Sequence, residues 1–129
     1  MTLVNGQYAM AEWNETPLHE QGASQKCTRV EAFGKIEGAL VGDAKTFYLL
    51  TYITKDTGIF TGYTLFDIKA GDRTGSFVAS DNGVFDAKSA SSRWVIVEGS
   101  GAGDFKGIKG SGSFKASHGL TFDFELELE

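Results

Sequence analysis

Residues 120–129 read LTFDFELELE, and this stretch decides the fold class. Apolar side chains alternate with polar ones over its whole length, from Leu120 to Glu129. A period of two places all the apolar side chains on one face, which is typical of an antiparallel strand with one buried and one solvated face. A helix would instead need apolar residues three and four positions apart. The stretch therefore predicts a strand.

The same period of two recurs along the chain, and no window of eleven residues keeps a helical apolar pattern. We expect further strands at residues 7–15, 27–37, 45–54, 58–69, 73–80, 84–85, 91–98 and 110–117. Turn signals separate them at residues 42–43, 56–58, 70–72, 82–83 and 118–119. Asn82-Gly83 is the strongest of these signals, because a type I′ turn needs positive φ at both central positions.

Eight or nine short strands joined by tight turns predict an all-β protein, either a sandwich or a barrel. Glycines within the predicted strands favour the barrel, because they relieve the coiling that closure demands. They include Gly34, Gly38, Gly62 and Gly75. Since 129 residues suffice for one core, we expect residues 1–129 to form a single domain, a small antiparallel closed β-barrel of about eight strands.

Residues 99–114, GSGAGDFKGIKGSGSF, raise the alternative of a phosphate-binding loop. Such a loop opens a helix, whereas here a glycine-broken strand follows, and the spacing matches neither a dinucleotide fingerprint nor a Walker loop. We expect these glycines to turn the chain out of one strand. Phe105 and Ile108 are then predicted to plug the end of the barrel.

Composition excludes several classes of partner. The formal net charge of −5 and the absence of a basic cluster argue against nucleic acid and anionic membranes. No stretch approaches the roughly 20 apolar residues that span a bilayer, and no secretory signal is visible, so we expect a cytoplasmic protein. Cys27 is the only cysteine and no zinc spacing occurs. We expect neither a metal nor a cofactor.

Aromatic residues on the predicted strands are the candidates for ligand binding: Trp13, Tyr48, Tyr52, Tyr63 and Trp94. Inward side chains of neighbouring barrel strands surround one space, so these residues either fill the core or line a cavity for a small apolar or aromatic molecule. Glu15 shares a strand face with Trp13, and if it turns inward it becomes a weak candidate general acid or base.

The two histidines are poor candidates for chemistry. His19 lies in a predicted polar loop, residues 15–26, which either forms a lid over the barrel mouth or is simply solvated. His118 lies in a predicted turn. Without a third ligand at a recognisable spacing, neither histidine indicates a metal site.

The predicted strands at 45–54 and 58–69 are apolar on both faces. Phe47 and Leu49 oppose Tyr48 and Leu50 in the first of them. A strand that is apolar on both faces needs cover on both, and in a barrel this small the outer cover is a loop or another subunit. We therefore expect a homo-oligomer that uses these strands.

The most distinctive motif is WVIVEGSGAGDFKGIKG at residues 94–110, and weaker ones are WNE at 13–15, FGKIEG at 33–38, and GSFV at 75–78 leading to NGVFD at 82–86. Together they resemble the bacterial domain-of-unknown-function 3224 family over nearly the whole chain. The resemblance implies a barrel of the allene oxide cyclase type, related to the dirigent proteins, in which relatives form oligomers and the interior receives a hydrophobic small molecule. It implies no established activity. It also implies Glu in place of Thr64 and His in place of Asp81, so any working pair at these positions is altered here.

Three functions remain open at this stage. The first is a binding barrel for a small apolar or aromatic ligand. The second is an isomerase- or cyclase-like enzyme in the manner of the fold relatives, with Glu15 stabilising charge. The third is a structural or interaction protein that acts through the surface of its oligomer.

Overall fold

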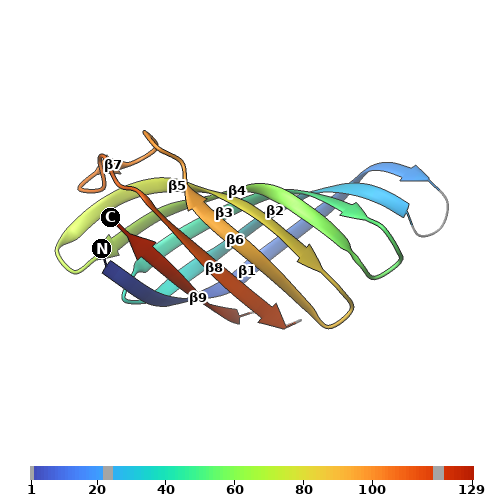
Figure 1. The fold of residues 1–129 in the computed structure, drawn as a ribbon, viewed down its shortest axis with the longest axis horizontal. Coiled ribbons are helices and arrows are strands. Elements are labelled where there is room, and N and C mark those ends of the chain that lie inside the picture. Colours follow the sequence, from blue (N-terminus) through green and yellow to red (C-terminus); the bar gives the residue numbers. More distant parts are fainter. Residues whose placement is uncertain (1, 22–24, 118–120) are drawn as a thin grey trace.

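The computed structural model describes residues 2–21, 25–117 and 121–129, which contain nine strands and no helix (Figure 1). The strands are β1 (Thr2–Gln21), β2 (Gln25–Gly38), β3 (Val41–Tyr52), β4 (Gly58–Ala70), β5 (Arg73–Phe85), β6 (Ser89–Ile96), β7 (Ala102–Gly103), β8 (Gly110–Ser117) and β9 (Thr121–Leu128). All pairings are antiparallel, in the order β4-β3-β2-β1-β9-β8-β6-β5, and β4 pairs with β5 to close the ring. The short β7 pairs with β5 outside the ring. The predicted closed eight-stranded barrel is confirmed.

Two predicted turns are wrong. Asn82-Gly83 lies within β5, where Gly83 pairs with Ser92, and the expected strands at 73–80 and 84–85 are one strand. Gly83 does not have positive φ. Its role is close packing, because a Cβ at this position would meet the Phe60 ring at 2.5 Å and also the carbonyl oxygen of Ser91. The predicted turn at 42–43 is also wrong, since both residues belong to β3.

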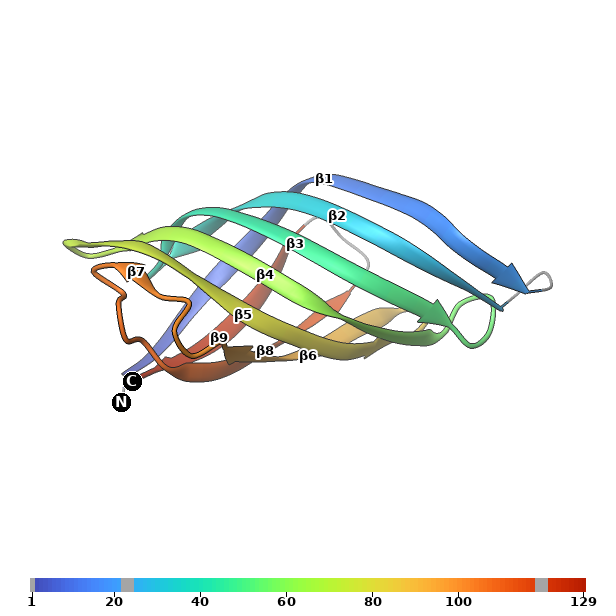
Figure 2. The ribbon, with the colours of Figure 1, turned by 90° about the horizontal axis from the view of Figure 1, so that it is seen from above.

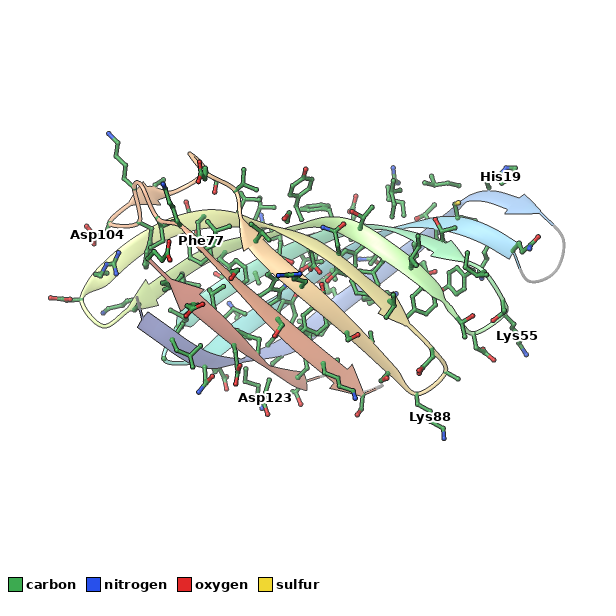
Figure 3. The ribbon with its side chains drawn as sticks, in the orientation of Figure 1. His19, Lys55, Phe77, Lys88, Asp104 and Asp123 are labelled. Carbon is green, nitrogen blue, oxygen red and sulfur yellow. The ribbon has the colours of Figure 1, made fainter. Side chains whose placement is uncertain are left out.

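The predicted polar loop at residues 15–26 is wrong as well. β1 continues to Gln21, and His19 pairs with Cys27 of β2. The histidine side chain is exposed and lies on the outside of this hairpin (Figure 3). The predicted turn at 118–119, including His118, lies outside the described residues.

One end of the barrel is plugged as predicted. The segment between β6 and β8 folds back over this end, which also carries both chain termini (Figure 2). Phe105 is fully buried and Ile108 is 6% exposed. The Phe105 ring packs against that of Phe77 at 5.7 Å between centroids, and Arg73 lies over its face. The glycine-rich stretch is therefore a barrel corner.

Aromatic side chains fill the middle of the barrel. Trp94 is 1% exposed, and its ring lies within 5.4 Å of the rings of Phe66, Phe114 and Phe124, centroid to centroid. These contacts combine burial of large apolar surfaces with favourable tilted ring geometry. The end opposite the plug is the one at which β3 turns into β4 and β5 into β6 (Figure 2).

A candidate ligand cavity in the barrel mouth

A cavity of about 640 Å³ lies within the barrel at the end opposite the plug. Seven aromatic side chains line it, together with four aliphatic or thioether side chains, one serine and one carboxylate. The lining residues are Met10, Trp13, Glu15, Tyr48, Leu50, Tyr52, Phe60, Phe85, Ala90, Phe114, Ala116, Ser117 and Phe122. A mostly apolar concavity of this size with few polar groups is typical of sites for small organic molecules.

A β-bulge in β1 directs the side chains of Trp13 and Glu15 towards the cavity. Met10 pairs with Gly34 and Glu12 with Phe33, so Ala11 has no partner on β2. The extra residue reverses the alternation of the strand. Even-numbered residues such as Tyr8 face the interior before the bulge, and odd-numbered residues face it afterwards. Trp13 and Glu15 therefore line the cavity, although Trp13 remains 45% exposed, whereas Glu12 does not line it.

Three donors hold the Glu15 carboxylate. Trp13 Nε1 donates to Glu15 Oε1 at 3.2 Å, while Thr28 Oγ1 and the Tyr52 hydroxyl each donate to Glu15 Oε2 at 2.8 Å. The donors come from β1, β2 and β3, so the closed sheet itself fixes the carboxylate. Burial, and then the bond to Glu15, raises the pKa of Tyr52 to about 12. The phenol therefore keeps its proton at neutral pH and remains a donor to Glu15.

A second carboxylate lies deeper in the barrel. Tyr48 is four residues before Tyr52 on the same face of β3, and its hydroxyl donates to Asp81 Oδ2 at 2.6 Å. Thr64 also donates to Oδ2, at 3.1 Å, and Ser92 donates to Oδ1. Asp81 is completely buried. In the described part of the chain no cation pairs with it.

The surroundings of Asp81 have two opposite effects on its pKa. Burial raises the pKa of Asp81, and the hydrogen bonds from Ser92 and Tyr48 act in the opposite direction. Burial also raises the pKa of Tyr48, as does the neighbouring Asp81. Thr64 and Asp81, the two positions at which the family resemblance implied other residues, are thus in direct contact. A buried carboxylate with a perturbed pKa next to a cavity is a feature found often at functional sites.

Two further polar atoms near this cluster, Tyr8 Oη and Trp94 Nε1, are buried without a hydrogen-bond partner among the described residues. Tyr8 is 2% exposed and stacks on Phe122, a lining residue of the cavity. Burial raises the pKa of Tyr8.

The structure brings together Trp13, Tyr48 and Tyr52 of the five candidate aromatic residues, with Glu15 among them. Trp94 lies in the core below the cavity and does not line it. Tyr63 lies on the outer face, 52% exposed, because the alternation of β4 turns it away from the interior.

The family resemblance drew attention to positions 64 and 81, but Asp81 was not among the predicted site residues, although its place in the strand is a signal. It occupies an inward position of β5 in line with Phe77 and Ala79, where period two predicts an apolar residue. The phenylalanines that line the cavity were not among the predicted site residues either, because their alternating positions are equally typical of a barrel filled by its own side chains.

Among the described residues, no group of three or more His, Cys, Asp and Glu side chains is placed to hold a metal. No helix in the described ranges is long and apolar enough to cross a bilayer.

Comparisons with known proteins address the family and the fold. The model of the family described as "Protein of unknown function (DUF3224)" matches residues 4–128. A crystal structure of a protein with unknown function from the DUF3224 family of Shewanella oneidensis MR-1 matches with a TM-score of 0.75 and 19% sequence identity, covering 100% of this chain and 97% of that one. Among curated proteins there is no significant match. Because the family model spans almost the entire sequence, the chain belongs to the DUF3224 family.

Proposed function

We propose that this protein binds a small apolar or aromatic molecule in the cavity at the barrel mouth. The observation that supports the proposal is the lining, in which seven aromatic side chains surround about 640 Å³ and a single fixed carboxylate, Glu15, faces inward. Aromatic walls provide apolar contact area, and a few placed polar groups orient the ligand.

Native mass spectrometry of the purified protein, followed by denaturing release, tests whether a ligand is carried. A reproducible extra mass on each subunit supports the proposal, and its released chemistry identifies the ligand. For a ligand found in this way, or in a screen of aromatic compounds, Ala116→Phe fills the cavity from β8 and should abolish binding. Lys115→Phe is the matched control, because the neighbouring side chain of β8 is exposed and does not line the cavity. Equal binding by both variants would contradict the assignment of the cavity.

An isomerase- or cyclase-like activity is a second candidate, favoured by the inward Glu15 carboxylate at the ligand cavity. In that case Glu15→Gln should lower turnover of a bound reactive substrate without weakening its binding in proportion. Unchanged turnover would remove Glu15 from any catalytic role.

We also propose that the protein forms a homo-oligomer through the outer face of β3 and β4. β3 and β4 are paired along both of their edges, so another subunit can associate with these two strands only through their outer face. On this face Phe47 is 39% exposed and lies opposite Tyr63 in the register, while Leu65 lies opposite Val78 of β5. Light scattering during size-exclusion chromatography gives the subunit number. A monomer of 13.9 kDa at high concentration would refute this part of the proposal.

A further inference from the structure

Three of the polar groups that face the cavity, on Glu15, Tyr48 and Tyr52, are placed as hydrogen-bond acceptors. Glu15 presents its carboxylate, and Tyr52 uses its only hydroxyl proton to bond it. Tyr48 likewise uses its proton on Asp81, so only its oxygen and ring remain for the cavity. A ligand whose polar end donates hydrogen bonds fits this arrangement, and a ligand that needs donors finds few.

Acidic groups, and no basic ones, lie in the described lining of the cavity or directly behind it. Glu15 lines the cavity and Asp81 lies behind Tyr48, and neither forms an ion pair in the described part of the chain. No Lys, Arg or His is among the described residues that line the cavity. An anionic ligand would therefore approach the Glu15 carboxylate with no cation in the lining to offset it, whereas a cationic ligand would complement that carboxylate.

The aromatic walls complement a cation as well. The faces of Trp and Tyr rings attract ammonium groups, and cages of such rings are a known means of holding organic cations. Trp13 and Tyr52 flank Glu15 and both donate to it, so the carboxylate and two ring walls meet at one point. Phe85 packs edge-on against Tyr52 at 5.0 Å between centroids and extends the wall.

The protein itself already places one ammonium group on this wall. Lys26 Nζ lies 4.6 Å from the centroid of the Tyr52 ring. Lys26 shares its strand face with Thr28, which also bonds Glu15, and pairs with Tyr52 in the β2–β3 register. Lys26 does not line the cavity, and it is the second residue of β2, which begins at the open end of the barrel (Figure 2), so it lies at the entrance. Its charge would compete with that of a cationic ligand and would attract an anionic one.

We infer that the ligand of this barrel is an organic cation, an aromatic or alkyl amine whose ammonium group binds between Glu15, Trp13 and Tyr52 while its apolar body fills the cavity. This inference rests on the proposed binding function and narrows it to one chemical class. The apolar body lies against Phe60, Phe114 and Phe122 in the depth of the cavity.

Three probes that share one aromatic body test the inference: 2-phenylethylamine, 2-phenylethanol and 3-phenylpropionate. They differ only in carrying a cationic, neutral or anionic end. Affinities measured by isothermal titration calorimetry should rank the amine at least about tenfold tighter than the alcohol, with the carboxylate weakest. Glu15→Gln should remove this preference for the amine, lowering the affinity for the amine by more than the affinity for the alcohol. The control Glu12→Gln alters an exposed carboxylate of the same strand, outside the cavity, and should change nothing.

Lys26→Met provides a second test that does not alter the Glu15 hydrogen bonds. It should tighten binding of the amine, because it removes the competing charge at the entrance. Equal affinity for amine and alcohol would overturn the inference and leave the binding function standing. Tightest binding of the carboxylate, lost in Lys26→Met, would overturn it in favour of an anionic ligand. Binding of none of the three probes by the folded protein would count against both the inference and the proposed function.

Discussion

The buried hydroxyls of Tyr48 and Tyr8 allow the same substitution to be made twice with opposite expected results. Tyr48 donates at 2.6 Å to a carboxylate that is completely buried, whereas the Tyr8 hydroxyl has no hydrogen-bond partner among the described residues. Tyr48→Phe removes one of three hydroxyl donors to Asp81. Above the folded pKa of Asp81, where the bond is made to a charged group, this should lower the free energy of unfolding by about 1.5–3 kcal/mol. Tyr8→Phe removes only an unpaired buried donor and should be neutral or stabilise by up to about 1 kcal/mol.

The cost of Tyr48→Phe should also depend on pH with a defined sign. Burial raises the pKa of Asp81 in the folded protein, and the bond from Tyr48 lowers it. Removing that bond raises the folded pKa further, while the unfolded pKa stays ordinary. Below the unfolded pKa both states are protonated and only a neutral bond is lost. As pH rises through the folded pKa, the lost bond would have stabilised a charge, so the cost increases.

Urea denaturation followed by tryptophan fluorescence measures both effects, because Trp94 is buried beside this cluster. The two variants and the unaltered protein are compared from below the ordinary aspartate pKa to mildly alkaline pH. A cost of Tyr48→Phe that is independent of pH would refute the reasoning, as would equal effects of the two substitutions.

Three further outcomes are expected. Phe105→Ala should lower the free energy of unfolding by about 3–5 kcal/mol, because a fully buried aromatic ring is lost from the plug; a loss below about 1 kcal/mol in urea denaturation would argue against it. Gly83→Ala should destabilise the barrel, since its Cβ would meet the Phe60 ring at 2.5 Å, and a thermal melt unchanged from that of the unaltered protein would contradict this. The pKa of Tyr52, raised by burial and by Glu15 to about 12, should fall in Glu15→Gln; nuclear magnetic resonance titration of the tyrosine rings measures it, and an unchanged value would show that Glu15 does not contribute.

The period of two was sufficient to predict the barrel strands, because each strand has one face in the core and the other in water. The plug could be predicted for a related reason: two large apolar residues within a glycine-rich segment have nowhere else to bury. Asn82-Gly83 failed as a turn because its local preference is weaker than the packing of Phe60 against a residue without a side chain. Turn propensity is local, and that contact comes from a different strand.

The candidate site was less predictable than the fold. Trp13 and Glu15 were recognised as sharing a face, but their inward direction depends on the bulge at Ala11, for which the sequence offers no residue-level signal. Asp81 could be recognised as unusual, because it is a charged residue type that continues the apolar face formed by Phe77 and Ala79. Its partners Tyr48 and Thr64 come from other strands, and only the register across the sheet brings them together.

The pairing of β1 with β9 has a consequence for synthesis of the chain. The remaining pairings of the ring join strands that follow one another closely in sequence, whereas Thr2 pairs with Leu128. A ribosome delivers β9 after every other strand of the ring, so until β9 emerges the nascent chain holds an open sheet whose edges are β1 and β8. Until β9 inserts between them, both edges are free to pair with a neighbouring nascent chain.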